Sequence, residues 1–253
     1  MKKNKILVVG NWKMNPESAE KAKEIFRGIK SVAKDLKNIK VVICPPFVYL
    51  SDLEKINDGS ITIGAQDVFW EKSGSFTGEI SSGMLKKEGE GYVIIGHSER
   101  RDLGETDEVV SKKIKTALQT GLRVILCIGE KVRDDHGEYL HFLRGQIISS
   151  LGKLQKRYLA KLVIAYEPVW AIGQAEAMKT GDLHEMTIFI KKVLVEIYGQ
   201  KDGISVSVLY GGSVNHNNAL EIIKNGEVSG LLVGRESLNP KKFGELLKNV
   251  DLL

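Results

Sequence analysis

Short apolar runs rich in β-branched residues recur along this chain of 253 residues, and their repetition constrains the fold more than any other feature. Eight such runs occur, at residues 6–9, 41–44, 61–64, 92–95, 124–128, 162–165, 206–209 and 231–233. Most of them are continuously apolar, which is typical of parallel strands that are covered on both faces. The pattern therefore predicts a buried parallel sheet.

Amphipathic segments fill the intervals between these runs. In the first, within residues 17–37, apolar side chains recur at three- and four-residue spacing and form one helical stripe. The stripe consists of Ala22, Ile25, Phe26, Ile29, Val32, Ala33 and Leu36. Later segments have similar spacing and end before Gly121, Gly199 and Gly226, where glycine is expected to stop each helix.

Eight alternations of strand and helix without a Pro- or Ser-rich linker fit one α/β architecture, a closed (β/α)8 barrel. We expect a single domain over residues 1–253. A doubly wound open sheet is the alternative, but its usual Gly-x-Gly-x-x-Gly turn after the first strand is absent from the sequence.

The composition narrows the classes of partner. The chain is 42% hydrophobic and 27% charged, and its formal net charge is +5. Because the lysines are mixed with acidic residues along the expected helices, the charge favours small anionic substrates over nucleic acid. The basic residues 1–5 precede an apolar stretch that is too short for a signal peptide or a membrane span, so no membrane association is expected.

The cysteines and histidines indicate the redox compartment and whether a metal is expected. Cys44 and Cys127 lie inside apolar runs, which predicts buried free thiols in a reducing, cytoplasmic location. The five histidines and two separated cysteines have no metal-ligand spacing, and neither a nucleotide fingerprint nor a P-loop occurs. We therefore expect no metal and no cofactor.

Residues with chemical capacity follow five of the eight expected strands. In strand order they are Asn11 and Lys13, His97 and Glu99, Glu167, then Gly211, Gly212 and Ser213, and finally Gly234. Each has a structural explanation when taken alone, such as a solvated lysine, a core histidine or a glycine turn. In a barrel, however, the carboxyl ends of all strands meet at one rim, so their shared placement predicts an active site there.

Glu167 is the strongest candidate for a catalytic base, although a solvated surface glutamate is the alternative. It follows the buried run 162–165 and precedes Pro168. Proline restricts the residue before it to extended geometry, which holds the carboxylate at a defined strand end. Proton transfer requires placement of this kind.

Five long strings carry a resemblance to a known family. They are Gly-Asn-Trp-Lys-Met-Asn at 10–15, Phe-Thr-Gly-Glu-Ile-Ser at 76–81, Ile-Gly-His-Ser-Glu-Arg-Arg at 95–101, Ala-Tyr-Glu-Pro-Val-Trp-Ala-Ile-Gly at 165–173 and Leu-Tyr-Gly-Gly-Ser-Val at 209–214. Over essentially its whole length the chain resembles the triosephosphate isomerase family. The resemblance implies a TIM barrel that interconverts dihydroxyacetone phosphate and D-glyceraldehyde 3-phosphate through an enediol or enediolate, in glycolysis and gluconeogenesis.

The resemblance also implies roles for the residues at the rim. Glu167 would move the proton between C1 and C2, and His97 would donate to the substrate oxygens as a neutral imidazole, a pairing for which this family is itself a known case. Lys13 would supply a fixed positive charge and Asn11 an amide donor. Glu99 would hold Lys13 or relay protons.

By the same resemblance, the substrate phosphate binds at backbone amides near residues without obstructing side chains. These residues are Gly173, Gly211, Gly212, Ser213, Gly234 and Arg235. Arg235 stands where the family has a second glycine, and Glu236 follows it instead of a small residue. We expect phosphate binding to persist if the Arg235 side chain points to solvent, with backbone strain of roughly 1 kcal/mol if this residue has a positive φ.

The segment after Glu167 resembles the family's mobile lid. It comprises Pro168, Val169, Trp170, Ala171, Ile172, Gly173, Gln174, Ala175, Glu176, Ala177 and Met178. The second half departs from the family's usual Thr-Gly-Lys and small-residue hinge. Closure is expected to persist, with an altered rate and open–closed balance.

A homodimer is implied as well. The expected interface residues are Met14, Asn15, Phe76, Thr77, Glu79 and Arg100, with Gln66 beside them, and Glu79 and Arg100 are expected to form an ion pair. Asp67 stands where the family commonly has asparagine. Arg101, Cys127 and Glu130 match positions that support the barrel and the rim.

Two other functions stay open at the level of the sequence. A Schiff-base aldolase would use Lys13 as its nucleophile on the same barrel. A non-catalytic phosphate-binding protein is the second alternative, because the changes in the lid and at Arg235 are compatible with lost activity. The presence of every proton-transfer residue argues for the isomerase.

Overall fold

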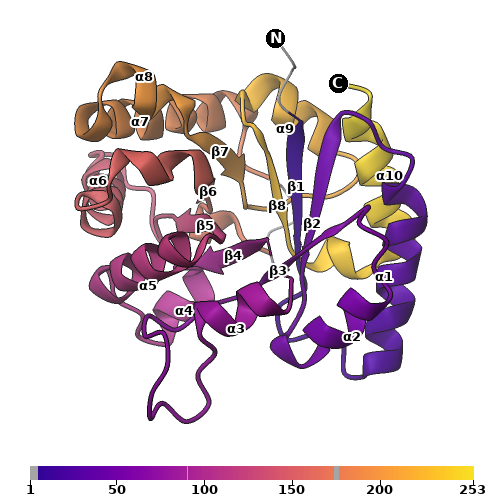
Figure 1. Cartoon of the computed structure of the whole chain (residues 1–253). Coiled ribbons are helices and arrows are strands. Elements are labelled where there is room, and N and C mark those ends of the chain that lie inside the picture. Colours follow the sequence, from indigo (N-terminus) through magenta and orange to yellow (C-terminus); the bar gives the residue numbers. More distant parts are fainter. Residues whose placement is uncertain (1–4, 90, 174–176) are drawn as a thin grey trace.

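Eight parallel strands close into a barrel in chain order in the computed structural model, which describes residues 5–89, 91–173 and 177–253 (Figure 1). The strands are β1 (Ile6–Asn11), β2 (Ile39–Cys44), β3 (Thr62–Ala65), β4 (Tyr92–Ile95), β5 (Arg123–Ile128), β6 (Leu162–Tyr166), β7 (Ser207–Tyr210) and β8 (Gly230–Val233). Because β1 pairs with both β2 and β8, the sheet has no free edge. The barrel prediction is confirmed, and the open-sheet alternative is wrong.

Helices cover the outside of the barrel (Figure 1). They are α1 (Ala19–Ala33), α2 (Leu50–Lys55), α3 (Ser82–Lys87), α4 (Ser98–Asp102), α5 (Asp107–Thr120), α6 (Glu138–Leu151), α7 (Thr180–Tyr198), α8 (Gln200–Ser205), α9 (Ala219–Gly226) and α10 (Pro240–Asp251). Short 3-10 turns are η1 (Phe47–Tyr49), η2 (Lys156–Lys161), η3 (Val169–Ala171) and η4 (Arg235–Leu238). Over the described part of the chain, no helix is long and apolar enough to cross a membrane.

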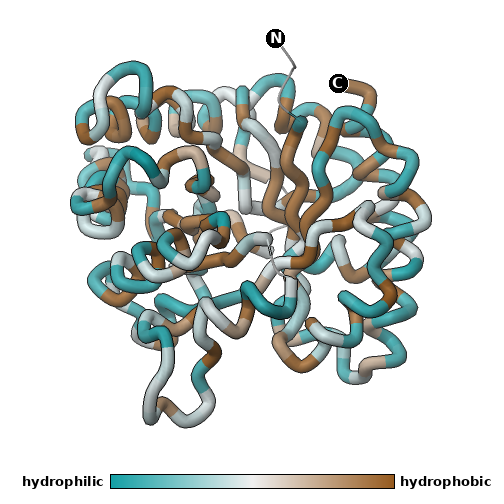
Figure 2. The backbone as a smooth tube through the Cα atoms, viewed as in Figure 1, coloured by the Kyte–Doolittle hydropathy of each residue, from teal (hydrophilic) through white to brown (hydrophobic). Residues whose placement is uncertain are grey.

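The strands bury side chains on both faces, which is why their sequences are continuously apolar. In β1, Leu7 and Val9 point into the barrel, whereas Val8 packs toward the helices. Figure 2 shows the resulting hydrophobic strands at the centre of the molecule, inside a more hydrophilic outer layer. The interior is therefore a packed core and not a pore.

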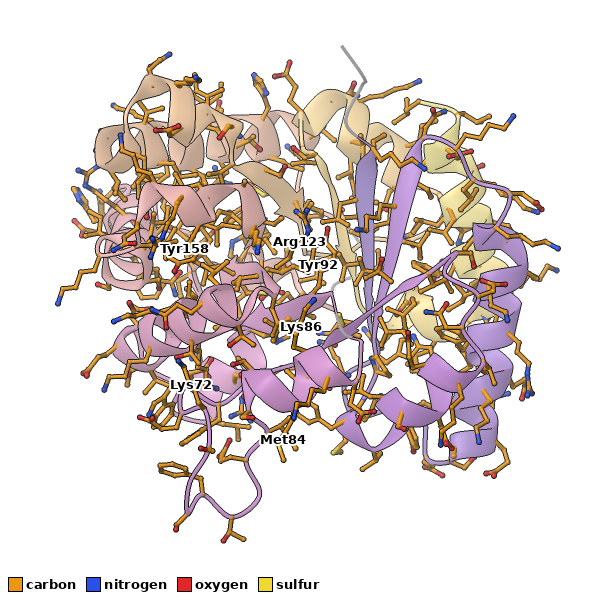
Figure 3. All side chains as sticks on the ribbon, in the orientation of Figure 1. Lys72, Met84, Lys86, Tyr92, Arg123 and Tyr158 are labelled. Atoms are coloured by element: carbon orange, nitrogen blue, oxygen red, sulfur yellow. The ribbon has the colours of Figure 1, made fainter. Side chains whose placement is uncertain are left out.

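The end of the barrel where the strands begin is closed by an aromatic ring between two cations. Lys40 and Arg123 lie 5.0 and 5.9 Å from the centre of the Tyr92 ring, and Figure 3 shows Tyr92 beside Arg123. Burial and the neighbouring Arg123 lower the pKa of Lys40. The opposite end, where the strands finish, contains the pocket described below.

Helix ends follow the predicted glycines in two of three cases. Gly121 caps α5 with φ 97°, and Gly199 follows α7 with φ 87°. The expectation for Gly226 is wrong by one residue, because α9 includes it and Glu227 takes the left-handed conformation with φ 51°. The reason is packing: a Cβ on Gly226 would lie 2.5 Å from the Leu183 side chain, so the glycine is needed for helix contact.

Both cysteines are buried free thiols, as the sequence predicts. Burial raises the pKa of the Cys44 thiol, and burial together with the Glu167 carboxylate raises the pKa of the Cys127 thiol. We expect neither thiol to react with a disulfide reagent at pH 8 in the folded protein, and both to react once it is unfolded. The stabilisation from protonated thiols should be lost as the pH rises above the ordinary thiol pKa of about 8.5, because only the unfolded chain ionises there.

A spectrophotometric thiol titration with and without denaturant measures this difference. Rapid reaction of either cysteine in the folded protein would contradict the burial of both thiols.

Candidate active site

A pocket of about 300 Å³ opens at the carboxyl ends of the strands. It is lined by all of the predicted rim residues except Glu99. Glu99 pairs with Lys13, which does line the pocket. The volume suits a small ligand at the lower end of the usual range. Among the described residues, no group of three or more His, Cys, Asp or Glu side chains could hold a metal ion.

Glu167 is fixed by its backbone at the end of β6. Its N–H donates to the Ile128 carbonyl at 2.8 Å, and Val169 N–H donates to the Glu130 carbonyl at 3.0 Å. The backbone of Glu167 comes so close to Gly129 that a Cβ there would lie 1.7 Å from the Glu167 carbonyl oxygen. The end of β5 and the two residues after it therefore hold the Glu167 backbone in place.

The Glu167 carboxylate is buried, with 2% of the residue exposed. One oxygen lies 3.3 Å from His97 Nε2, and the other accepts from the Ser98 N–H at 3.4 Å. The side chain passes over Gly211, where a Cβ would lie 2.7 Å from Glu167 Cγ. The placement of the Glu167 side chain thus depends on the absence of a side chain at Gly211, directly after β7.

His97 precedes α4 as its N-cap residue, so its ring is held against the first turn of that helix. Its Nδ1 accepts a hydrogen bond from the Glu99 N–H at 3.2 Å. An imidazolium has donors at both nitrogens, so this geometry assigns a neutral ring with the proton on Nε2. That N–H points to Glu167 and the pocket.

Lys13 has a left-handed backbone with φ 54°, which is unusual for a residue with a side chain. Asn11 Oδ1 accepts the Lys13 N–H at 3.0 Å, and Gln66 Nε2 donates to its carbonyl at 2.8 Å. Lys13 Nζ then lies 2.5 Å from Glu99 Oε1, which confirms the expected contact. Since Asn11 Oδ1 is occupied, its amide NH₂ is the group available to a ligand.

The predicted phosphate residues Gly211, Gly212, Ser213 and Gly234 line the same pocket. A Cβ on Gly212 would lie 2.3 Å from the Tyr210 hydroxyl, so only glycine allows this approach. The hydroxyl oxygen of Tyr210 accepts backbone N–H groups from Met178 and Ser213. It therefore joins the end of the predicted lid to the loop after β7.

The start of the lid is anchored to Glu130, two residues after β5. Glu130 Oε1 accepts from Trp170 Nε1 at 2.8 Å and from the Tyr166 hydroxyl at 2.9 Å. Pro168 precedes η3, which includes Val169, Trp170 and Ala171. Ile172 and Gly173 reach the pocket, whereas Gln174, Ala175 and Glu176 lie outside the described residues.

Two sequence expectations about arginines are settled by the geometry. Arg235 is exposed and begins η4 without a positive φ, so the conditional backbone strain is not present. The expected ion pair between Glu79 and Arg100 is wrong within this chain. Both side chains line one crevice, but Arg100 Nη2 pairs with Asp67 at 3.0 Å because that carboxylate lies at the adjacent end of β3.

Sequence reasoning missed three groups near the pocket. Tyr210 is the last residue of an apolar strand, so its sequence context predicts a core side chain. The glycines that follow it are the sequence signal that its hydroxyl has space to contact the lid. His216 and Glu236 bridge the loops after β7 and β8: Glu236 Oε1 accepts the His216 N–H at 3.2 Å and lies 2.5 Å from His216 Nδ1. Two polar residues 20 positions apart carry no pattern from which such a pair could be predicted.

Comparison with known proteins agrees with the geometry of the site. The sequence profile described as triosephosphate isomerase matches residues 6–250. The chain belongs to the triosephosphate isomerase family. Curated triosephosphate isomerases of Dictyoglomus thermophilum and Geobacter metallireducens are 42% and 41% identical to it; the matches cover 96% and 95% of this chain and 98% and 97% of theirs.

A crystal structure of triosephosphate isomerase from Bartonella henselae has a TM-score of 0.86 and 33% identity, covering 97% of this chain and 98% of that one. The family and the fold together make the chain an isomerase of triose phosphates. In a triosephosphate isomerase, the close approach of glycine to the acid has a direct consequence for activity.

Replacing Gly211 by alanine should displace the Glu167 side chain and lower kcat/KM by about 10²-fold, the scale expected for a shift of about 1 Å at a reacting group. The matched control is Gly145→Ala on α6, where no atom lies within 4 Å of the added Cβ. Steady-state kinetics with circular dichroism checks both variants. Equal activities in the two variants would contradict a steric role for Gly211.

Proposed function

We propose that residues 1–253 form one catalytic domain in which Glu167 and His97 move the protons that interconvert dihydroxyacetone phosphate and D-glyceraldehyde 3-phosphate. The single observation that carries the proposal is the buried contact of 3.3 Å between the Glu167 carboxylate and the N–H of a neutral His97 ring. An acid–base pair at this separation, on the floor of a small pocket with glycines around it, suits proton transfer next to a carbonyl.

The steps follow from the two groups. Glu167 takes a proton from C1 as the C–H electron pair forms the C1=C2 bond, and the carbonyl oxygen on C2 takes the proton of His97 Nε2. His97 then recovers a proton from the oxygen on C1, which becomes the aldehyde, while Glu167 returns its proton to C2. The cycle is balanced and ends with both groups in their starting states.

The positive charge of Lys13 stabilises the negative charge of the enediolate and of the phosphate. Lys13 reaches the pocket from a strained, doubly hydrogen-bonded backbone, so its ammonium is held in place before substrate arrives. Its ammonium is also paired with Glu99, an arrangement that suits a fixed cation better than the nucleophilic amine that an aldolase needs.

Substitutions at the pair test this function. Glu167→Asp and His97→Gln should each lower kcat by about 10²-fold or more, because proton transfer by a positioned group contributes at least that much. The control is Glu221→Gln, which changes an exposed carboxylate on α9. Coupled assays in both directions measure the rates, and an inactive but folded parent protein would sink the proposal.

We also propose that the protein acts as a homodimer in the cytoplasm, where its thiols stay reduced, and that it serves both glycolysis and gluconeogenesis. Exposed apolar side chains support the dimer: Met14 is 95% exposed, Phe76 lies on the loop that protrudes after β3, and Met84 lies beside that loop on α3 (Figure 3). Gln66, which follows β3, donates a hydrogen bond to the Lys13 carbonyl in the loop after β1. Asn15, Thr77, Glu79 and Arg100 are the polar residues proposed for the same interface.

Sedimentation equilibrium should give twice the chain mass of 28.0 kDa. Met14→Glu should shift the equilibrium toward monomer, since it places a charge where apolar surface is buried on association. Leu252→Glu is the matched control, because Leu252 is 81% exposed and follows α10 at the opposite end of the barrel. A parent protein that sediments as a monomer would refute the dimer.

A further inference from the structure

Arg235 brings a second permanent positive charge to the pocket. The other is Lys13, which is paired with Glu99. Within the described residues, the Arg235 guanidinium forms no ion pair and no hydrogen bond, although it lines the pocket. An exposed surface arginine without a partner is ordinary, but a charged fork beside a pocket for an anion has five donors to offer.

The guanidinium is directed toward the lid. Arg235 Nη2 lies 3.3 Å from the point where a Cβ on Gly173 would stand. Gly173 has φ 76° and belongs to the lid, whereas Arg235 begins η4 directly after β8. The side chain therefore reaches from the start of η4 to the lid, and it lines the same pocket as Ser213 and Gly234.

The neighbouring acid does not neutralise this charge. Glu236 also lines the pocket, but its carboxylate is held by the backbone N–H and the ring of His216. This contact draws the negative charge toward the loop after β7. The acid next to Arg235 is thus engaged by His216 and leaves the guanidinium available to a dianion.

We propose that the Arg235 side chain binds the substrate phosphate directly and holds it against the lid at Gly173. A guanidinium pairs with phosphate oxygens through parallel hydrogen bonds, in addition to the backbone amides nearby. Arg235 then makes the pocket selective for phosphorylated over phosphate-free trioses. The inference rests on the proposed isomerase site, since it names the group that recognises one end of the same substrate.

The test compares Arg235→Gln and Arg235→Lys with Arg157→Gln, which removes an exposed arginine from η2, before β6, at the far end of the barrel. Two quantities are measured: the dissociation constant for inorganic phosphate by calorimetry, and the ratio of kcat/KM for glyceraldehyde 3-phosphate to that for glyceraldehyde. Arg235→Gln should weaken phosphate binding and lower the ratio, each by about tenfold or more. Arg235→Lys should recover only part of both, because an ammonium lacks the planar fork, and Arg157→Gln should change neither.

Two results would overturn the proposal. One is phosphate binding by Arg235→Gln within twofold of the parent. The other is an equal loss of kcat/KM for both substrates, which would indicate a structural defect instead of phosphate recognition. Calorimetry needs no turnover, so a parent that binds phosphate through Arg235 but does not isomerise would refute the proposed function and leave this inference standing.

Discussion

The contact on which the rest of the structure depends is the pairing of β8 with β1. The β8 backbone approaches β1 so closely that a Cβ on Gly230 would lie 1.9 Å from the Leu7 carbonyl oxygen. Closure removes the sheet edges and brings all strand ends to one ring. Without it, Lys13, which follows β1, and Arg235, which follows β8, would not share a pocket.

Around this ring, close packing positions Glu167, the proposed catalytic base. Gly129 on one side and Gly211 on the other leave room for the backbone and the side chain of Glu167. The acid therefore has a fixed position before substrate binds, which is what rapid proton transfer requires. Similarly, the absence of a side chain at Gly212 allows the Tyr210 hydroxyl to reach the lid at Met178.

Much of the fold was predictable because its signals are local. The run 92–95 matches β4 to the residue, and the other strands differ from prediction by one or two positions. The residues that line the pocket were predictable where they lie at or just after the end of a strand. Predictions were wrong where a contact between residues distant in the sequence decided the outcome. Packing against Leu183 requires Gly226 inside α9, so the helix is capped by Glu227. Arg100 forms its ion pair with Asp67 and not with Glu79.

The sequence by itself determined the strand and helix periods, and it predicted the rim at which polar residues with chemical capacity gather. These features depend on residue type and on spacing within one strand–helix unit. Only the tertiary structure decided the partner of Glu236 and the direction of Arg235. Each of these depends on atoms from separate βα units, and their distances are set by barrel closure and side-chain packing, which no local pattern encodes.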